Sequence, residues 1–521
     1  MARTKSLIVT SEAFPLAKSG GLGDAVTGMA RALSLAGIDV GILMPAYRGV
    51  LERVIRPRRI AHLAGMPGGE ATLIGASCPE SGLPVYLLCN NALYDRENLY
   101  LDEHGEPYAD NALRYAALAH AAVRVAAGLP KMRRPDILHA QDWHAGLVPL
   151  LVRAAGLRDV KTVLTVHNLA FQGLFPLSFA RRLGVPDSYC TNDGARFFDQ
   201  LSFLKAGIRY ADRITTVSKT YAREILTPEF GCGLDPLLRA RANNLLAIPN
   251  GIDDTLWNPA NDRYLGHLCY SVHKLAKKTR AKVALQEAFG LHADHNAPLL
   301  AMGSRLTRQK MADVAVQALP DALQRHPTLQ VAIIGRGEYQ YERALEDLAS
   351  RYPGRCAVRI GYDEATAHRL HAGADMLLHG SRFEPFGLTP LYAMRYGTIP
   401  IGSRVGGMAD TIVDPGGQDD DRAMLAATGV LFSGDRPQDM GLAIDRALRL
   451  YHQPTVWCSM QRNGMTCQFG WSTAVQPYLA LYDNLVNATP RGQVPAPLIR
   501  PLPVPVYSRR AHNGIAVPAV H

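Results

Sequence analysis

One lysine, one aspartate and three glycines fall within the stretch KSGGLGD, which runs from Lys18 to Asp24. Glycine costs backbone entropy, so glycines at positions 20, 21 and 23 indicate a backbone that a ligand approaches closely or that turns sharply. A phosphate or a sugar would require such an approach. A tight loop without any ligand explains the same glycines, so the stretch by itself leaves both interpretations open.

Two more polar stretches in the first half of the chain carry candidate site residues. They are QDWHAG, at 141–146, and HNLAFQG, at 167–173. Asp142 and His167 are of interest because both stretches follow predicted strands, where α/β sheets bind their ligands. Each residue also has an ordinary structural interpretation. Asp142 could be the N-cap of a helix, and His167 could be a hydrogen-bonded histidine at a strand end.

The second half contains the stretches SRLTRQK, at 304–310, and SRFEPFGLTP, at 381–390. Arg305 and Lys310 could be solvated charges, but a lysine at the start of a helix opposes the helix dipole and so favours an anion nearby. Glu384 lies between a phenylalanine and a proline, where a bare surface carboxylate is less expected. The helix that starts at Leu388 could bind a phosphate at its N-terminus.

Short apolar runs that alternate with helical patterns must position these stretches. The runs predict strands at 6–10, 39–44, 84–89, 136–140, 161–167, 213–218, 245–249, 298–303, 329–335, 356–361, 375–379, 399–402 and 428–432. Helical patterns include 24–36, 111–128, 144–155, 272–290, 310–325, 338–350 and 437–451. Continuous apolar strands between helices are typical of parallel sheets covered on both faces. We therefore expect an α/β chain of two Rossmann-like, doubly wound domains that face each other across a cleft.

The domain boundaries follow from changes in composition. The turn-rich stretch PNGIDDTLWNP separates an N-terminal domain, 1–255, from a C-terminal domain, 256–470. A last helix at 471–488 is expected before a tail at 489–521, whose prolines and arginines predict disorder.

Composition excludes several classes of protein. The 521 residues carry a net charge of +10 without a dense basic run, so no nucleic-acid partner is expected. No apolar run is long enough to cross a membrane, and the N-terminus does not read as a signal peptide. The eight cysteines form no C-x-x-C pair, so neither a zinc site nor a disulfide framework is indicated. We predict a soluble cytoplasmic protein without a membrane partner.

The order of the motifs is more informative than any one of them. K-S-G-G-L-G-D, D-W-H, H-N-L-A-F-Q-G, N-G-I-D, S-R-L-T-x-Q-K and E-P-F-G-L-T follow one another along the chain. This succession, over roughly residues 5–487, closely resembles the family of bacterial glycogen synthases and plant starch synthases. The resemblance implies the GT-B glycosyltransferase fold, in which the last helix crosses back to the first domain. It also implies elongation of an α-1,4-glucan such as glycogen from ADP-glucose, with retention of the anomeric configuration and with no metal or other cofactor.

The resemblance assigns expected roles residue by residue. Lys18 and the backbone of Gly20 and Gly21 would lie at the donor, and Arg305 and Lys310 would hold its diphosphate. Glu384 would contact the donor glucose, His167 would lie beside the anomeric centre, and Asp142 would lie near the sugar. Further expected substrate contacts are Asp24, Tyr94, Asn168, Gln172, Asn250, Phe386, Gly387, Leu388 and Thr389.

The sequence departs from the family pattern at five positions, and the smallest change is Ser19, where threonine or valine is common. Phe386 and Pro390 replace a cysteine and a glutamine that bacterial relatives often carry, and Met311 replaces the glycine after Lys310. The backbone near Lys310 is therefore expected to differ. Tyr392 stands where many GT-B enzymes have a second glutamate, which excludes ribose recognition by that carboxylate.

Two alternatives stay open at this point. One is another GT-B glycosyltransferase with a different donor or acceptor; a glucan phosphorylase is less favoured, because it would need a lysine-bound pyridoxal phosphate. The other is a catalytically inactive protein that binds glucan or a sugar nucleotide. An inactive protein is disfavoured, because five residues expected at the active site are all present: Lys18, His167, Arg305, Lys310 and Glu384.

Overall fold

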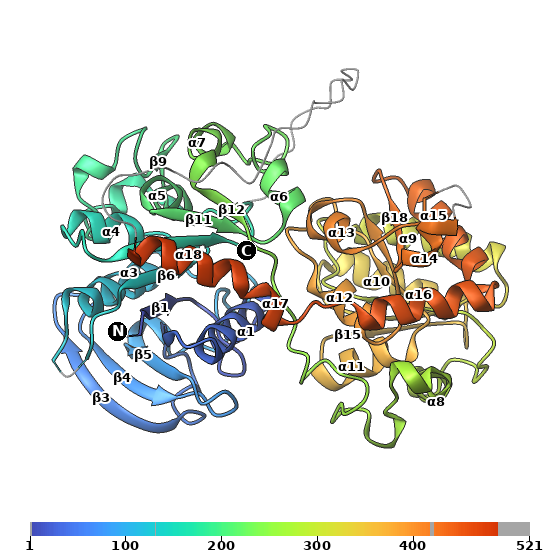
Figure 1. Cartoon of the computed structure of the whole chain (residues 1–521). Coiled ribbons are helices and arrows are strands. Elements are labelled where there is room, and N and C mark those ends of the chain that lie inside the picture. The colour runs from blue at the N-terminus through green and yellow to red at the C-terminus, as the bar shows by residue number, and fades with distance from the viewer. Residues whose placement is uncertain (1–2, 131, 417–420, 488–521) are drawn as a thin grey trace. The chain divides into compact units, whose positions relative to one another are not determined.

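The computed structural model (Figure 1) describes residues 3–130, 132–416 and 421–487. The chain forms two compact units. Of the described residues, the first unit comprises those up to Val217, Ala222–Ile248 and those from Ala474 to Asn487; the second comprises Ser218–Tyr221 and the described part of Pro249–Thr473. The tail predicted at 489–521 lies outside the described residues.

The first unit is built on a nine-stranded sheet in the order β12-β11-β7-β6-β1-β2-β5-β4-β3. From one edge to the other, the strands are Leu245–Ala247, Arg213–Thr216, Lys161–Val166, Ile137–Gln141, Lys5–Val9, Asp39–Pro45, Pro84–Cys89, Ala71–Ser77 and Ile55–Leu63. All seven strands from β12 to β5 pair in parallel. β1 and β6 are buried along their whole length, as strands covered on both faces must be.

The helices of the first unit mostly connect successive strands, and the longest are α1 and α3. They are α1 (Gly21–Leu35), α2 (Asn91–Tyr94), α3 (Asn111–Ala127), α4 (Val148–Ala154), α5 (Phe203–Tyr210), α7 (Asp235–Ala240) and α18 (Gln476–Asn487). A further helix, α6 (Lys219–Glu224), begins in a segment that belongs to the second unit, where Thr220 donates its N–H and its hydroxyl to Asp410. The helix predicted at 144–155 is interrupted, because a 3₁₀ turn at Trp143–Ala145 precedes α4.

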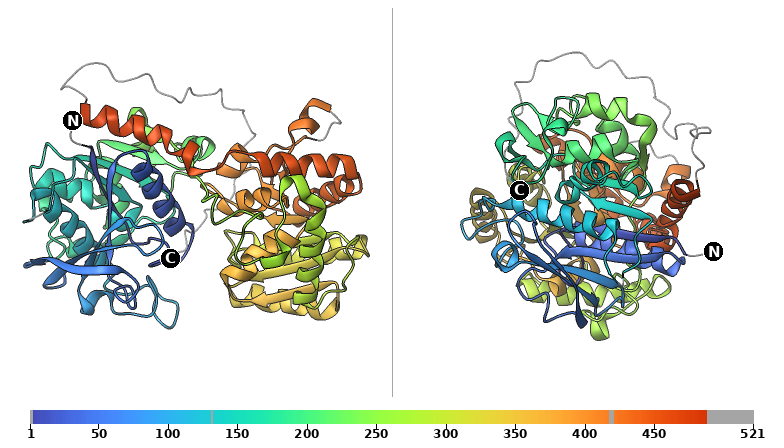
Figure 2. Two further views of the ribbon diagram at one scale, coloured as in Figure 1. Left: turned by 60° about the horizontal axis from the view of Figure 1, so that its bottom comes forward. Right: turned by 90° about the vertical axis from the view of Figure 1, so that its left-hand side faces the viewer.

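Helix α18, near the end of the chain, packs on the sheet at which the chain begins. The red helix lies along the first unit in Figure 1 and in both views of Figure 2. The phenol of Tyr482 lies 2.8 Å from Nδ1 of His139 in β6 and accepts a hydrogen bond from Ser6 in β1. The other imidazole nitrogen of His139 lies 2.6 Å from the hydroxyl of Thr165 in β7. Helix α18 thus supplies a hydrogen-bond partner to buried polar groups of β1 and β6, and His139 extends this network to β7.

The second unit has a six-stranded sheet, all parallel, in the order β15-β14-β13-β16-β17-β18. In that order the strands are Cys356–Ile360, Gln330–Gly335, Leu299–Gly303, Met376–His379, Ile399–Ser403 and Val430–Phe432. Its helices are α8 (Lys278–Phe289), α9 (Ala312–Arg325), α10 (Tyr339–Arg351), α11 (Glu364–Gly373), α12 (Leu388–Arg395), α13 (Gly406–Thr411), α14 (Asp421–Ala426), α15 (Pro437–Tyr451), α16 (Pro454–Thr466) and α17 (Trp471–Ala474).

Both faces of this second sheet are covered. Leu300 and Met302 of β13 point into a cluster with residues of α9, α15 and α16. The alternate residues of the same strand, Leu299 and Ala301, point into a second cluster with residues of α8, α11 and α12. Side chains alternate between the faces of a strand, so one continuous apolar run supplies both cores. The predicted doubly wound arrangement is therefore present in this unit.

Every predicted strand coincides with a strand of the structure, but the prediction missed five others. β3 and β4 extend the first sheet as antiparallel strands, and β8 (Leu174–Pro176), β10 (Gln200–Ser202) and β9 (Arg196–Phe197) form a separate sheet. β3 carries the exposed stretch IRPRR, and β4 alternates between buried and half-buried residues, so neither is a continuous apolar run. The long helix predicted at 272–290 is likewise divided into α8 and a preceding 3₁₀ segment, Val272–Lys277, which is itself kinked at Lys274.

Candidate active site

The glycine loop after β1 is held from behind by a carboxylate. Glu12 is buried, and its Oε2 accepts the backbone N–H groups of Ser19 at 2.8 Å and Gly20 at 3.3 Å. Lys18 lies beside Asp24 in the first turn of α1, with 2.9 Å between Nζ and Oδ2. Gly21 is the first residue of that helix. The loop is thus fixed at its backbone by one acid and at its lysine side chain by another.

Two of its glycines serve different purposes. A Cβ on Gly23 would lie 3.2 Å from the carbonyl oxygen of Ala17, so packing within the protein favours glycine there. A Cβ on Gly20 would meet no atom within 4 Å, and the φ of Gly20, −155°, is an extended value that any residue adopts. Neither packing nor backbone conformation therefore requires glycine at position 20. This open side favours the close approach of a ligand over the tight-turn interpretation.

Asp142 lies at the carboxyl end of β6 in a strained conformation. Its φ of 57° and ψ of −169° fall in a region that is largely confined to glycine. Its Oδ1 accepts the backbone N–H groups of His167 at 3.2 Å and Asn168 at 3.3 Å, which ties the end of β6 to the end of β7. Burial raises the pKa of Asp142 to about 7, against these two hydrogen bonds, which lower it.

His167 is held by the residue before Asp142. Its Nε2 lies 2.8 Å from Oε1 of Gln141, and burial lowers the pKa of His167 to about 4. The imidazole is therefore neutral at neutral pH. In that state an Nε2–H donating to Gln141 leaves Nδ1 as the acceptor. The structure thus brings Asp142 and His167 together, with opposite departures from their ordinary pKa values.

Three expected substrate contacts of the first unit have structural partners instead. Tyr94 is fully buried and donates its phenol to the carbonyl of Arg114, so its hydroxyl already has a partner within the protein. Gln172 is buried and donates its amide to the carbonyl of Cys232. Asn168 is half-buried, and its Oδ1 accepts the N–H of Ala170. These side chains shape the loops rather than offer free polar atoms.

In the second unit, two loops that follow adjacent strands are tied together. β13 and β16 pair directly, so the loops after Gly303 and His379 begin side by side. Arg382 donates its N–H to the carbonyl of Gln309, and the Gln309 amide donates to the carbonyl of Phe383. The two predicted stretches, 304–310 and 381–390, are therefore parts of one structural site.

Lys310 and Glu384 form an ion pair at the centre of this site. The Lys310 ammonium donates to Oε2 of Glu384, which also accepts the Ser381 hydroxyl at 3.0 Å and lies 3.2 Å from Nε2 of His379. Burial by itself would raise the pKa of Glu384, but Lys310 and the hydrogen bond from His379 hold that pKa well below its ordinary value. Glu384 is therefore ionised at any pH at which the protein would be assayed.

Arg305 differs from Lys310 in its surroundings. It is exposed, and its guanidinium donates to Oε1 of Gln309 at 3.3 Å. Within the part of the chain that the structure describes, no carboxylate pairs with Arg305. Its positive charge is available to a ligand.

Met311 keeps the backbone conformation that a glycine would adopt. Its φ of 54° and ψ of 34° are left-handed, and its side chain is buried at the N-cap of α9. The expectation that the backbone after Lys310 differs from the family pattern therefore finds no support in this geometry. The methionine accepts a strained conformation that is costly for a residue with a Cβ.

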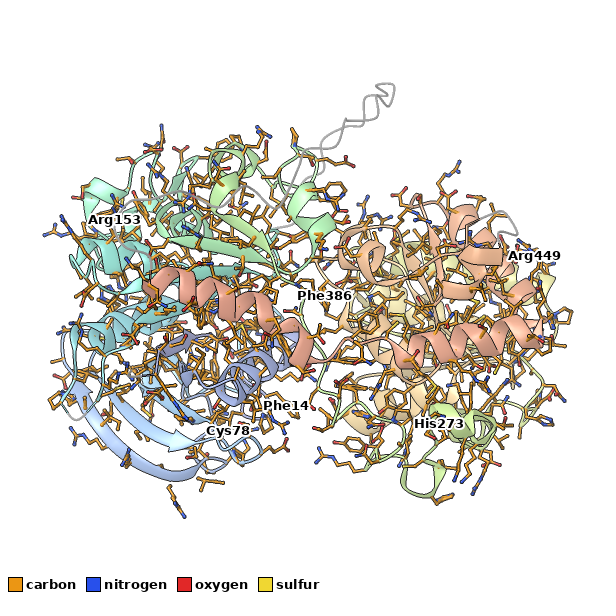
Figure 3. All side chains as sticks on the ribbon, viewed as in Figure 1. Phe14, Cys78, Arg153, His273, Phe386 and Arg449 are labelled. Atoms are coloured by element: carbon orange, nitrogen blue, oxygen red, sulfur yellow. The ribbon has the colours of Figure 1, made fainter. Side chains whose placement is uncertain are left out.

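The loop that carries Glu384 lies against the start of α13. A Cβ on Gly406 would fall on the carbonyl oxygen of Glu384, so only glycine permits this contact. Phe386, labelled in Figure 3, is buried, and its contact with substrate stays a prediction. Gly387, with a φ of 86°, is the N-cap of α12 and contributes no capping side chain. Leu388 and Thr389 form the first turn of that helix, whose N-terminus favours an anion.

The two remaining positions from the sequence also lie in the second unit. Asn250 is buried just after the unit begins. Tyr392 is buried and stacks on Trp257, with ring centroids 3.8 Å apart and planes 9° apart. The tyrosine thus packs the segment PNGIDDTLWNP onto α12 where other GT-B enzymes have a glutamate.

Sequence reasoning missed four residues that hold the candidates in place: Glu12, Gln141, His379 and Ser381. Each lies at the end of a strand or within three residues of that end. The strand-end rule that selected Asp142 and His167 applies to them equally, so this was the available signal.

The described ranges contain neither a candidate metal-binding cluster nor a candidate membrane-spanning helix. Among residues 3–130, 132–416 and 421–487, no group of three histidine, cysteine, aspartate or glutamate side chains is placed to hold a metal ion. In the same ranges, no helix has the length and apolar character that a membrane span requires.

Two family models match the chain in succession. The model of the starch synthase catalytic domain matches residues 5–240, and the model of glycosyl transferases group 1 matches residues 286–459. The chain is 77% identical to a glycogen synthase of Bordetella petrii over 521 residues, or 100% of this chain and 100% of that relative. It is 59% identical to a glycogen synthase of Bordetella bronchiseptica over 503 residues, or 96% of this chain and 99% of that relative.

Two solved structures also match the chain over most of its length. The catalytic domain of starch synthase IV from Arabidopsis thaliana, bound to ADP and acarbose, matches with a TM-score of 0.83 at 28% identity, over 94% of this chain and 100% of that one. A sucrose-phosphate synthase from Thermosynechococcus elongatus matches with a TM-score of 0.59 at 18% identity, over the same shares, and shows a likeness of fold. The predicted GT-B fold class, with mainly parallel sheets in two α/β domains, is confirmed.

Proposed function

Because this chain belongs to the glycogen synthase and starch synthase family of glycosyltransferases, we propose that it transfers glucose from ADP-glucose to the non-reducing end of an α-1,4-glucan, with retention of the anomeric configuration. The starch synthase IV catalytic domain that it resembles is bound to ADP and acarbose, which supports a nucleotide-sugar donor and a glucan acceptor.

The observation that carries the proposal is the positive charge fixed in the second unit. Lys310, the exposed guanidinium of Arg305 and the N-terminus of α12 all follow the ends of two adjacent strands. Breaking a glucosyl–diphosphate bond leaves negative charge on the diphosphate. Fixed cations and helix N-terminal N–H groups stabilise that charge as it develops, without reorganisation. Arginine offers a planar fork and lysine a point charge, which suit different phosphate oxygens.

Glu384 limits the net charge of this site. In the free protein it accepts the Lys310 ammonium, so the lysine is held in place before a donor arrives. A diphosphate would share the ammonium with Glu384, while the second carboxylate oxygen would be left to accept hydroxyls of the donor glucose. His379 and Ser381 both contact the oxygen that Lys310 occupies, which leaves the other one for this role.

The first unit supplies groups of a different kind. As the bond to the diphosphate breaks, the glucosyl carbon gains positive charge. The imidazole of His167 is neutral because of its burial, so it does not repel that charge. Asp142, when ionised, would favour the charge. Lys18 and the open backbone at Gly20 would face the donor.

One assay tests the proposal directly. Purified protein is incubated with a glycogen primer and with radiolabelled ADP-glucose or UDP-glucose, and the label incorporated into polymer is measured. We expect incorporation from ADP-glucose. A rate that is about tenfold higher with UDP-glucose would contradict the proposed donor, and binding of primer without any incorporation would favour the inactive binding protein.

The same assay, repeated in EDTA, tests the proposed independence from metal. Lys310 and Arg305 supply the positive charge that a divalent cation supplies in other phosphate sites. We expect the same rate with and without the chelator. An activity that is lost in EDTA and restored by Mg²⁺ or Mn²⁺ would contradict this part of the proposal.

A further inference from the structure

Glu12 is a buried carboxylate that none of the expected catalytic roles uses. It is 3% exposed and lies three residues beyond the end of β1. Its described partners are neutral: the N–H groups of Ser19 and Gly20 on Oε2, and the phenol of Tyr100 on Oε1 at 2.6 Å. A buried charge without a cationic partner is costly. The contacts around Glu12 must therefore account for the burial of its carboxylate.

The first reason is the start of α1. Helix N-termini leave backbone N–H groups without partners, and side chains of the N-cap residue often accept them. Here the N-cap is Gly20, which has no side chain to do so. The carboxylate of Glu12 takes over this role from another part of the chain, because it also accepts the backbone N–H of Gly23 in the first turn of α1, and its negative charge suits the helix dipole. The loop can therefore have glycine where a ligand approaches and still be fixed in place.

The second reason is the link to the end of β6. The Tyr100 phenol, which donates to Glu12, also lies 2.8 Å from the Ser11 hydroxyl. The Tyr100 ring stacks on His144, with centroids 4.8 Å apart and planes 29° apart. His144 lies two residues after Asp142. One carboxylate thus connects the loop of Lys18 to the segment that carries Asp142.

From these contacts we propose that Glu12 is a positioning residue for catalysis, which holds the Lys18–Gly20 backbone in the geometry that contacts the donor. This inference rests on the proposed function, because Lys18 acts on a donor only if the protein is a transferase. Glu12 itself touches no reacting atom. It affects turnover by holding the loop of Lys18 and Gly20 in place.

The variants follow from the hydrogen bonds. In Glu12→Gln, the amide oxygen still accepts the two N–H groups, and the NH₂ group donates to the Tyr100 phenol, whose proton turns to Ser11. In Glu12→Ala, both N–H groups and the phenol lose their partner. Tyr100→Phe removes only the contact to Oε1. Asp136→Ala is a matched control, because Asp136 accepts the N–H of Lys5 at 2.7 Å at the other end of β1.

The first measurement is amide hydrogen exchange at positions 19–23 in the protein without substrate. It does not depend on activity, so it tests the role of Glu12 even if the proposed function fails. We expect faster exchange there in Glu12→Ala, exchange close to that of the wild type in Glu12→Gln, and no change there in Asp136→Ala. Unchanged exchange in Glu12→Ala would overturn the proposal.

The second measurement is steady-state kinetics for donor and acceptor separately. We expect kcat/KM for the donor to fall about 10- to 100-fold in Glu12→Ala, because small misplacements of a contact cost that much. The KM for glycogen should stay unchanged, and Glu12→Gln should restore most of the loss. In a Lys18→Ala background, Glu12→Ala should have little further effect. Fully additive losses, or equal losses in Asp136→Ala, would reduce Glu12 to a structural residue.

If Glu12→Ala does not fold, Tyr100→Phe carries both measurements. We expect a smaller change in the same direction, since this variant leaves one carboxylate oxygen without its partner but keeps the cap of α1. One combination of results would overturn the proposal. In it, Tyr100→Phe and Glu12→Gln both keep wild-type exchange and donor kinetics, and Lys18→Ala also keeps normal donor kinetics.

Discussion

The titratable residues that follow β6 and β7 in the first unit are kept near neutrality, whereas Lys310, Arg305 and Glu384, which follow β13 and β16 in the second unit, carry full charges. Burial makes His167 neutral at neutral pH and brings the pKa of Asp142 to about 7. In the second unit, Lys310 and Glu384 form an ion pair and Arg305 is an exposed cation. The difference suits the two charges that the proposed glycosyl transfer would develop, because cations stabilise a departing diphosphate and nearly neutral groups do not repel a sugar that gains positive charge.

Both regions also contain a residue other than glycine at a positive φ, and the strain is offset in different ways. Asp142, at 57°, gains two hydrogen bonds from the N–H groups of His167 and Asn168. Met311, at 54°, gains the burial of its side chain instead. Strain at Asp142 is thus tied to polar groups of the candidate site, while strain at Met311 is tied to packing beneath it.

Removing the lysine of the charged region should have the largest effect. We expect Lys310→Ala to lower kcat by about 10²- to 10³-fold, as the loss of one preorganised donor to a developing charge does. It should also destabilise the protein by about 3–5 kcal/mol, because Glu384 stays buried without its cation. Steady-state kinetics and denaturant unfolding measure the two effects.

The double variant Lys310→Met with Glu384→Gln separates them. It removes both charges, so it should recover most of the stability but none of the activity. A double variant that is active would show that the ion pair is only structural.

Arg305 should matter almost as much for turnover and hardly at all for stability, since it is exposed. We expect Arg305→Ala to lower kcat by roughly 10²-fold and to change the free energy of unfolding by less than about 0.5 kcal/mol. Arg308→Ala is the matched control, because Arg308 is an exposed arginine of the same loop. Equal turnover in the two variants would remove Arg305 from the site.

The sequence predicted these two cations from their place after a strand, and the same rule selected Asp142, His167 and Glu384. It succeeded because the carboxyl ends of parallel strands meet at one edge of a sheet. The rule does not predict how deeply a side chain is buried. Tyr94 and Phe386, which the family resemblance singled out, are buried, and their positions in the sequence did not show this.

The fold was predictable to the same degree. Continuous apolar runs revealed all the parallel strands, but β3 and the two- and three-residue strands β8, β9 and β10 lack such runs. The role of Glu12 could not be predicted, because it depends on Tyr100, 88 residues away along the chain.

The pH dependence of activity should come from the first unit. Asp142 titrates near neutrality, whereas the pKa of Glu384 is lowered far below this range. We expect kcat/KM to rise by roughly tenfold as the pH rises from about 6 through the pKa of Asp142, because about a tenth of the carboxylates are ionised one unit below the pKa. The profile of Asp142→Asn should be flat over this range.

Stability should change in the opposite direction. The pKa of Asp142 is raised by folding from 3.8 to about 7, so the folded state binds the proton more tightly. The contribution of protonated Asp142 to stability is therefore lost as the pH rises from about 4 to about 7, and does not change further above that. Denaturant unfolding of the wild type against Asp142→Asn measures it. A difference that is constant with pH would contradict the raised pKa.

The smallest expected effect is a difference in stability between two variants of Met311. Met311→Ala removes a buried side chain but keeps a Cβ at a left-handed φ, and we expect it to destabilise the protein by about 2–5 kcal/mol. Met311→Gly removes the same side chain and relieves the strain, so it should be more stable than the alanine variant by about 1 kcal/mol. Urea unfolding compares the two. An alanine variant as stable as the glycine variant would show that position 311 is not strained.

The packing of α18 on the first unit has a consequence for synthesis of the protein. When the ribosome has completed the strands of the first sheet, the residues of the second unit and those of α18 have still to be translated. Until Tyr482 emerges, His139 and Ser6 lack the partner that they have in the finished sheet. The second unit is in effect an insertion within the first, and the first cannot reach its final state on a nascent chain. Any stop codon ahead of α18 therefore leaves an unfinished N-terminal unit, although all of its candidate catalytic residues have been made.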